Sequence, residues 1–254
     1  MTDQPLISCL VPLFNAEAYV AEALDSILGQ TYENTEIVVV DDGSTDRSAD
    51  VVRGYGARVR LVSQSNTGLG GARNACLRQA QAPFIAFLDA DDIWHPQKLD
   101  LQMAVFETEP ETDICFGYAQ NFWVDELDAE RTKYGDWVLA APVRTLNLST
   151  SLMRREVFDT CGPFDATLTD SADKHWVMRI DEAGLKTMYV PDIILYRRLH
   201  RQNLTRRMDD SDRTNMVDLL KTTLDRRRRV GMYRKDGSSD NRVRPVRRWP
   251  NSPP

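Results

Sequence analysis

The sequence predicts an α/β domain with a mostly parallel central sheet and helices on both faces, a Rossmann-like three-layer sandwich. Two short apolar runs, 36–40 and 84–88, have the length and composition of strands that are buried on both faces. An amphipathic helical pattern separates the first of these runs from an earlier apolar strand at 6–13. Strand, helix and strand at this spacing form a right-handed βαβ unit, so the carboxyl ends of the strands meet at one edge of the sheet.

The first half of the chain alternates strands and helices. The strand at 6–13 ends in a turn, where Asn15 is placed to cap a helix whose apolar positions recur over 16–28. After the second strand, Asp46 and the two residues before it supply the cap of a second helix. A shorter third strand is expected over 58–62.

A glycine-rich stretch at 65–74 follows this third strand. Three glycines within four positions permit a tight turn at the start of a helix. The spacing matches neither the P-loop nor the dinucleotide-binding fingerprint, so a simple loop is the default interpretation. Arg73, early in the helix, either reaches the sheet edge or forms a surface salt bridge, and the sequence leaves both roles open.

The second half of the chain is less strongly patterned. Residues 125–144 are polar and without clear periodicity, and we interpret them as an active-site loop or lid. We expect a nucleotide-binding half at 5–111, a second half at 112–205, and a helical extension with a disordered basic tail at 206–254. The other expected elements are a helix over 96–106, a strand over 113–118, a helix over 173–182, and two short strands at 185–190 and 193–196.

Length and composition set the class of protein. The 254 residues, 42% of them hydrophobic, suffice for one large domain with a short appendage. Four cysteines without paired or metal-ligand spacing favour a reducing, cytoplasmic location. The start of the chain lacks the pattern of a signal peptide, and no apolar run approaches the ~18 residues that would span a membrane.

Charge is distributed unevenly along the chain. From Arg226 onward, ten Lys and Arg stand against two Asp and Glu, so this tail carries +8 and the rest of the chain −14 of the net −6. An acidic body that binds an anionic nucleotide needs a metal ion or local arginines to mask its field. The tail would suit contact with an anionic membrane surface, and the lack of interleaved stacking aromatics argues against nucleic acid.

Carboxylates follow both buried strands, Asp41 and Asp42 after the first and Asp89, Asp91 and Asp92 after the second. In an extended segment, Asp89 and Asp91 would converge while Asp92 points elsewhere. Two converging carboxylates repel each other unless a cation lies between them, and magnesium-type ions take one or two carboxylates plus phosphate oxygens. Two aspartates with this spacing more often form a solvated acidic turn before a helix. The acids that follow the other buried strand favour a metal site instead.

The motifs together resemble the family-two glycosyltransferases of the GT-A fold, over roughly residues 5 to 205. The resemblance implies inverting transfer of a sugar from a nucleotide diphosphate sugar to an acceptor hydroxyl, in the synthesis of a polysaccharide, glycolipid or other glycoconjugate. The segments that carry it are VPLFN at 11–15, VDDGSTD at 40–46, NTGLGGARN at 66–74, and FLDADD at 87–92 followed by Pro96 and Leu99.

The resemblance assigns a donor site to residues of the first half. Pro12, Phe14 and Asp41, with Asp42 as a neighbour, would hold the nucleoside. Asp89 would contact the ribose. A further residue, Arg73, would add a cation near the nucleotide.

The resemblance also implies a divalent ion, Mg²⁺ or Mn²⁺, bound by Asp91. Such an ion stabilises the negative charge that develops on the leaving diphosphate. His200 lies in a segment similar to a family segment near the diphosphate, so it would contact phosphate or metal, with a surface histidine as the alternative.

Inversion needs a base on the face of the sugar opposite the leaving group. The family places an acidic pair, usually Glu-Asp, at the start of a helix with a Trp three residues on, and Asp173 with Trp176 fits this frame. Ala172 stands where the glutamate is expected. If the family motif aligns a few residues earlier, Asp170 is the base instead. The non-catalytic alternative for Asp173 is an N-cap or first-turn acid, which the helix dipole favours.

The expected partners are a nucleotide diphosphate sugar and an acceptor that is a glycan, a lipid-linked sugar or another hydroxyl compound. Peripheral contact with the inner face of a membrane would come from the basic tail. Two other functions stay open: a catalytically impaired nucleotide-sugar-binding protein, suggested by Ala172, and a nucleotidyltransferase. The second lacks support because no glycine- and lysine-rich triphosphate loop is present.

Overall fold

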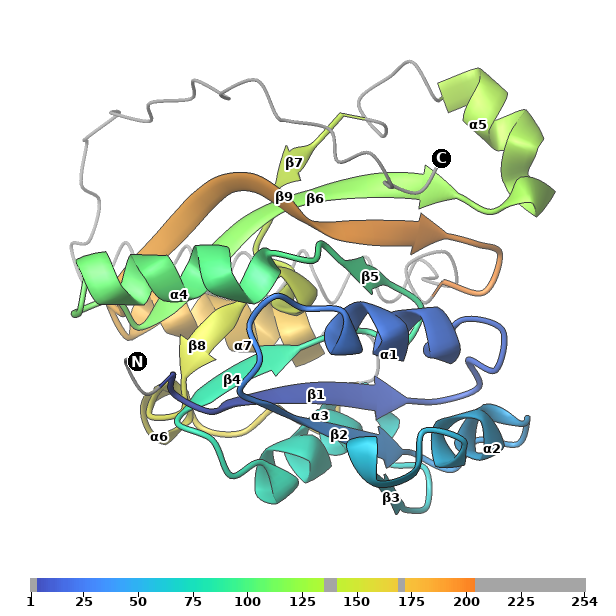
Figure 1. Cartoon of the computed structure of the whole chain (residues 1–254), viewed down its shortest axis with the longest axis horizontal. Coiled ribbons are helices and arrows are strands. Elements are labelled where there is room, and N and C mark those ends of the chain that lie inside the picture. The colour runs from blue at the N-terminus through green and yellow to red at the C-terminus, as the bar shows by residue number, and fades with distance from the viewer. Residues whose placement is uncertain (1–3, 135–140, 169–171, 204–254) are drawn as a thin grey trace.

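One continuous sheet runs through the molecule, in the strand order β3-β2-β1-β4-β8-β6-β9-β5, with β7 paired to β6 (Figure 1). The computed structural model describes residues 4–134, 141–168 and 172–203. The first four strands of this order are mutually parallel, which confirms the parallel arrangement predicted for the first half. They are β1 (Ile7–Leu13), β2 (Thr35–Asp41), β3 (Arg60–Ser63) and β4 (Phe84–Phe87).

The other half of the sheet is mixed. The short strand β8 runs antiparallel to both of its neighbours, β4 and β6, whereas β9 runs parallel to β6. The sheet therefore crosses both predicted halves, 5–111 and 112–205, and the boundary between them stays a prediction. The strands of this part are β5 (Ile93–Trp94), β6 (Ile114–Trp123), β7 (Val143–Arg144), β8 (Leu152–Arg154) and β9 (Thr187–Leu199).

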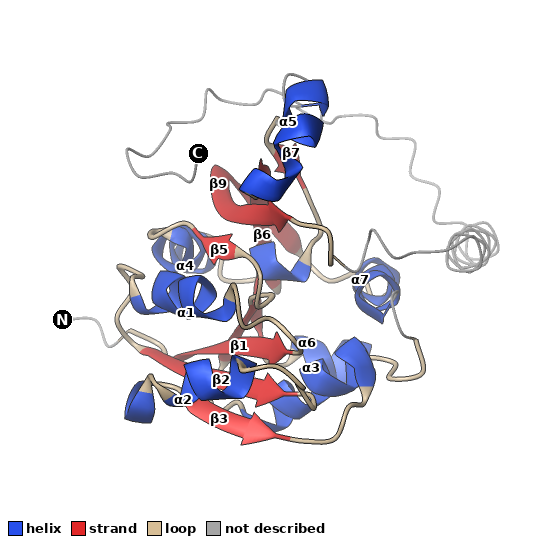
Figure 2. Cartoon of the chain, turned by 90° about the vertical axis from the view of Figure 1, so that its right-hand side faces the viewer, coloured by secondary structure: helices blue, strands red, loops and turns tan. Residues whose placement is uncertain are grey.

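Helices cover both faces of the parallel strands, as the three-layer prediction requires (Figure 2). Buried residues of α1 and α4 pack on one face, and those of α3, α6 and α7 pack on the other. The helices are α1 (Val20–Leu28), α2 (Ser48–Arg53), α3 (Gly68–Gln79), α4 (Lys98–Thr108), α5 (Asp128–Tyr134), α6 (Val157–Cys161) and α7 (Ala172–Glu182), with the 3₁₀ turns η1 (Gly56–Arg58), η2 (Asp125–Leu127) and η3 (Leu148–Thr150).

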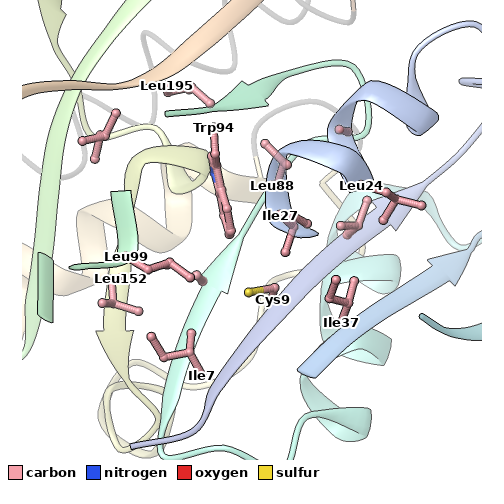
Figure 3. Packing of buried hydrophobic residues seen from close by; sticks show 14 of the residues in the cluster. Ile7, Cys9, Leu24, Ile27, Ile37, Leu88, Trp94, Leu99, Leu152 and Leu195 are labelled. Atoms are coloured by element: carbon pink, nitrogen blue, oxygen red, sulfur yellow. The ribbon is translucent and has the colours of Figure 1, made fainter. Parts of the chain in front are cut away.

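The strand β1 contributes side chains to both hydrophobic cores, one on each face of the sheet. Cys9 and Val11 point into the cluster beneath α1 and α4, while Leu10 points into the cluster beneath α3 and α7. Such alternation is expected of a strand that is buried on both sides. Figure 3 shows the first cluster, in which Trp94 lies among the apolar side chains that include Leu88 and Leu99.

The predicted pair of strands at 185–190 and 193–196 is one strand, β9. Its register against β6 shifts between the pairs Phe116–Tyr189 and Tyr118–Ile193, so β9 has extra residues there, including Pro191. An irregularity of this kind lets a strand continue past a proline, which cannot donate to the ladder.

Asn15 does not cap α1, which begins five residues later at Val20. Asn15 adopts the left-handed region at φ 47°, and its Oδ1 accepts from the Thr45 backbone N–H at 2.8 Å. Its own N–H donates to Ser44 Oγ at 3.0 Å. The residue therefore ties the turn after β1 to the turn after β2. Asp46 acts as expected, since its Oδ1 accepts from the N–H of Ser48 at the start of α2.

The stretch at 125–144 is not a continuous loop, because η2, α5 and β7 occupy most of its described part. Residues 135–140 lie outside the described residues, as do Asp170 and the tail at 206–254. Among the described residues, no helix has both the length and the apolar character that crossing a bilayer requires.

The glycine-rich stretch has a packing role at the start of α3. A Cβ added to Gly70 would lie 2.8 Å from the backbone oxygen of Asp165 and 3.2 Å from the Cβ of Ala172. Asn74, one turn further along α3, exchanges two 2.8 Å hydrogen bonds with the backbone of Phe164. The helix thus approaches the segment before α7 closely, and a small residue is required at the contact.

We expect Gly70→Ala to lower the free energy of unfolding by about 1–3 kcal/mol, because the new methyl group would have to displace backbone rather than a flexible side chain. Urea denaturation followed by circular dichroism measures this change. A variant as stable as the wild type would show that α3 and the segment before α7 are not in this close contact.

Candidate active site

A cleft of about 960 Å³ opens where the parallel strands end. Segments from both parts of the sheet line it, which places the turns after β1 and β4 opposite residues contributed by the second half of the chain. The lining residues lie in 12–16 at the end of β1, Tyr19 before α1, Asp42 after β2, Asn66 and 68–72 at the start of α3, 89–92 after β4, 145–148 at the start of η3, 173–178 of α7, and 197–203 at the end of β9.

The acids after β4 form a turn and not an extended segment, since the N–H of Asp92 donates to the carbonyl of Asp89 at 3.1 Å. Asp89, Asp91 and Asp92 all border the cleft, and the expectation that Asp92 points away from the other two stays a prediction. Asp92 is only 3% exposed, and its Oδ1 accepts from the Arg198 backbone N–H at 2.9 Å. Burial, with the neighbouring charges of Asp91 and Asp89, holds the pKa of Asp92 well above its usual range.

Asp91 meets His200 in the cleft. The Nε2 atom of His200 lies 2.9 Å from Asp91 Oδ2, and the side-chain amide of Asn203 donates to the same oxygen at 3.2 Å. His200 is buried, so the alternative of a surface histidine is wrong. No group of three or more His, Cys, Asp or Glu side chains in the described residues is arranged to enclose a metal ion by itself. An ion held here would need oxygen atoms from substrate and water to complete its coordination.

Arg73 is completely buried and lies between two carboxylates. Its NH2 atom donates to Asp89 Oδ1 at 2.8 Å and to Asp173 Oδ2 at 2.6 Å. The rings of Phe87 and Phe164 lie on it, with 5.1 and 5.9 Å between the guanidinium carbon and the ring centroids. The surface salt bridge that the sequence left open is therefore wrong. Arg73 links the turn after β4 to the first turn of α7.

Asp173 borders the cleft from α7. Burial raises its pKa to about 6, although the charge of Arg73 acts in the opposite direction. Its Oδ1 atom has no hydrogen-bond partner in the part of the chain that the structure describes. The neighbouring Ala172 is 1% exposed and packs against Gly70, so the place where the family pattern has glutamate is filled by the contact between α3 and α7.

The residues expected at the nucleoside divide into two groups. Pro12 and Phe14 border the cleft, and the ring of Phe14 is 49% exposed. Asp42 also borders it, but its Oδ1 accepts from the backbone N–H and the hydroxyl of Thr67, at 2.9 and 3.0 Å. This carboxylate therefore fastens the glycine-rich turn to the end of β2. Asp41 is 6% exposed, accepts from the Ser44 N–H at 3.0 Å, and is not among the cleft-lining residues.

Two cleft residues, Tyr19 and Asn203, and the buried Arg198 beside them escaped sequence reasoning. Tyr19 lies against the His200 ring with 4.6 Å between centroids, and Asn203 binds both Asp91 and the His200 backbone. Arg198 is buried beside them, and its Nε donates to the carbonyl of Asp91 at 2.9 Å. The spacing of His200 and Asn203 directly after an apolar strand is the only sequence signal that would have pointed to this group.

Comparison with known proteins gives one consistent family. The model described as "Glycosyl transferase family 2" matches residues 8–175. An uncharacterized glycosyltransferase of Nostoc sp. is 34% identical over 175 residues, which cover 63% of this chain and 54% of the relative. The putative glycosyltransferase EpsH of Bacillus subtilis is 37% identical over 123 residues, covering 47% and 36%. The chain thus spans about half, or less, of the length of these relatives.

Solved structures with a similar fold include a TarS 1-349 complex and an archaeal mannosyltransferase. The S. aureus TarS 1-349 complex with UDP-GlcNAc has a TM-score of 0.64 at 22% identity, over 80% of this chain and 61% of that one. The mannosyltransferase PcManGT from Pyrobaculum calidifontis, in complex with GDP-Man and Mn²⁺, has a TM-score of 0.61 at 20% identity, over 80% and 59%. At these identities the likeness concerns the fold.

We expect Arg73→Met to lower the free energy of unfolding by about 2 kcal/mol, less than for a fully enclosed ion pair because both carboxylates are partly exposed. The loss should shrink as the pH falls through about 6, where Asp173 becomes protonated and no longer needs a cation. Denaturant titrations above and below this pH measure both effects.

Arg53→Met, which removes an exposed pair with Asp50, is the matched control and should change stability little. A pH-independent loss would contradict the assignment.

Proposed function

The chain belongs to glycosyl transferase family 2 and has the GT-A fold, and on this premise we propose that it transfers a sugar from a nucleotide diphosphate sugar to an acceptor hydroxyl. The proposed reaction is metal-dependent and inverts the configuration at the sugar. One observation carries the proposal: Asp91, with His200 beside it, and Asp173 border the same cleft from different elements. The acceptor is a glycan, a lipid-linked sugar or another hydroxyl compound.

The size and lining of the cleft support a nucleotide diphosphate sugar as donor. Its volume of about 960 Å³ suits a ligand of that size. Pro12 and the exposed ring of Phe14 offer an apolar surface on which a base can stack. The solved neighbours were crystallised with UDP-GlcNAc and with GDP-Man, two donors of this class.

The chemistry of the acidic turn fits a divalent ion. Burial holds the pKa of Asp92 well above its usual range, and the charges of Asp91 and Asp89 act in the same direction. A cation at this turn would stabilise the charged form of these acids. Asp91 and His200 would hold the ion, and diphosphate and water oxygens would supply its other ligands. When bound, Mg²⁺ or Mn²⁺ stabilises the charge on the departing diphosphate. The PcManGT structure contains Mn²⁺.

Asp173 would take the proton from the acceptor hydroxyl. Arg73 holds Oδ2 and so fixes the orientation of the carboxylate. The other oxygen, Oδ1, is buried without a partner in the described structure, but the side chain as a whole is 28% exposed and borders the cleft, where an acceptor hydroxyl can approach it. A pKa of about 6 keeps the group deprotonated at neutral pH and basic enough to accept a proton. Asp41, Asp42 and Arg73 then act mainly by holding the walls of the site.

The alternative function is a nucleotide-sugar-binding protein with impaired catalysis, suggested by Ala172. Location is part of the proposal too. All four cysteines are free and buried, which suits a reducing, cytoplasmic compartment. Contact of the basic tail with the inner face of a membrane would bring the cleft to lipid-linked acceptors.

Removal of the Asp91 carboxylate should abolish the metal-dependent effect of nucleotide on stability. UDP or GDP with Mn²⁺ should raise the Tm of the wild type, and EDTA should cancel the rise. Asp91→Asn should show no Mn²⁺-dependent rise, because the ion loses its protein carboxylate. Asp50→Asn, at an exposed position of α2, should behave as wild type. An undiminished rise in Asp91→Asn would exclude Asp91 as the metal ligand.

Asp173→Asn should lower kcat by about 10²-fold or more, because it removes the base, while the Mn²⁺-dependent nucleotide shift of Tm is retained. In the wild type, activity should fall as the pH drops through about 6, since protonated Asp173 cannot accept the acceptor proton. Donor hydrolysis or transfer measured across pH tests both points. Activity in Asp173→Asn equal to that of the wild type would exclude Asp173 as the base. Nucleotide binding without any activity in the wild type would support the alternative with impaired catalysis.

A further inference from the structure

Lys98 is a buried lysine without an acidic partner. It begins α4 and is 0% exposed, and no ion pair joins it to an acid anywhere in the described residues. Burial lowers its pKa to about 7. An amine in such a place costs stability unless its hydrogen bonds are satisfied, so the groups that it contacts indicate its role.

The Nζ atom of Lys98 contacts a buried polar side chain, a backbone carbonyl and an aromatic ring. It donates to Gln102 Oε1 at 2.7 Å and to the carbonyl oxygen of Ser151 at 2.9 Å. It also lies 4.3 Å from the centre of the Trp94 ring. Lys98 and Gln102 lie one turn apart on the same side of α4, and Trp94 reaches Lys98 from β5. Lys98 is therefore the central member of a row formed by Trp94, Lys98 and Gln102.

This row binds three consecutive backbone carbonyls. The Trp94 indole N–H donates to Ser149 O at 2.8 Å, Gln102 Nε2 donates to Thr150 O at 2.9 Å, and Lys98 donates to Ser151 O. Buried carbonyls at the end of the 3₁₀ turn η3 would otherwise lack partners. The row thus fixes η3 from the side away from the cleft.

The other side of η3 belongs to the cleft. The Ser149 hydroxyl accepts from the backbone N–H of Asp89 at 3.1 Å, at the start of the acidic turn. Asn147 and Leu148 border the cleft directly. A continuous chain of contacts therefore leads from Lys98 through η3 to the backbone of Asp89 and to one wall of the cleft.

We propose that Lys98 is a positioning residue of the donor site, which holds η3 so that Ser149 fixes the acidic turn in the geometry that binds a nucleoside diphosphate. The inference rests on the proposed function and deepens it, since it names a residue that acts on the donor without touching it. Trp94 and Gln102 act with Lys98, and Ser149 is the link to Asp89.

Binding of UDP and of GDP, each with Mn²⁺, tests the proposal in the full chain by isothermal titration calorimetry. Lys98→Met keeps the length of the side chain and removes its N–H donors, and it should weaken binding by about tenfold, the effect typical of losing a supporting contact behind a metal-and-ligand site. Ser149→Ala should weaken binding similarly. The double variant should bind about as weakly as the weaker single variant, because both changes break the same link.

Val52→Ala is the control for lost stability, since it removes buried volume in α2, outside the cleft lining. It should lower the Tm and leave nucleotide binding unchanged. Should Lys98→Met fail to fold, Gln102→Leu takes its place with the same expectations, because it removes the donor to the Thr150 carbonyl.

Three results would overturn the inference: wild-type affinity in Lys98→Met, multiplying effects in the double variant, or an equal loss of affinity in Val52→Ala. If the wild type itself binds neither UDP nor GDP with Mn²⁺, the proposed function fails, and that outcome is distinct from a failure of the Lys98 assignment. Wild-type binding with unchanged affinity in Lys98→Met overturns only the latter.

Discussion

The buried guanidinium of Arg73 is the interaction on which the site depends. The same nitrogen of Arg73 binds Asp89, which follows β4, and Asp173 in α7, which lies 100 residues after Arg73 in the chain. A charge with no exposed surface needs both acids, and each acid is placed by the contact. Gly70 allows α3 to come close enough to the segment before α7 for this arrangement, because no Cβ stands between them. The geometry of the cleft therefore follows from one buried ion-pair network.

Negative charge nevertheless remains in excess around the cleft. Arg73 neutralises only part of the charge of the five acids that border the cleft, which are Asp42, Asp89, Asp91, Asp92 and Asp173. Burial raises the pKa of Asp92 and of Asp173, and the negative charge of Asp89 acts in the same direction on both. A site built in this way is costly for the empty protein, and it is suited to a cation that arrives with a diphosphate. The protein without ligand is therefore less stable at this site than it would be with less negative charge there.

Sequence patterns predicted the parts of this account that depend on local signals. The buried strands β2 and β4 have continuous apolar runs, so their carboxyl ends, with the acids that follow, could be placed at one edge of the sheet. The partners of Arg73 could not be predicted, because both contacts join residues distant in the sequence. The turn at 89–92 and the continuity of β9 also depend on hydrogen bonds and register set by neighbouring strands, which leave no periodic signal. The burial of Lys98 also leaves no signal in the sequence, because a lysine in a helix is ordinarily exposed.

The most direct measurement is a crystal structure of the chain with UDP or GDP and Mn²⁺, in which anomalous scattering locates the ion. The account predicts a Mn²⁺ ion between Asp91, His200 and the diphosphate oxygens, with Arg73 still bound to Asp89 and Asp173. An ion bound away from Asp91, or a nucleotide bound outside the cleft while Arg73 leaves both carboxylates, would contradict it.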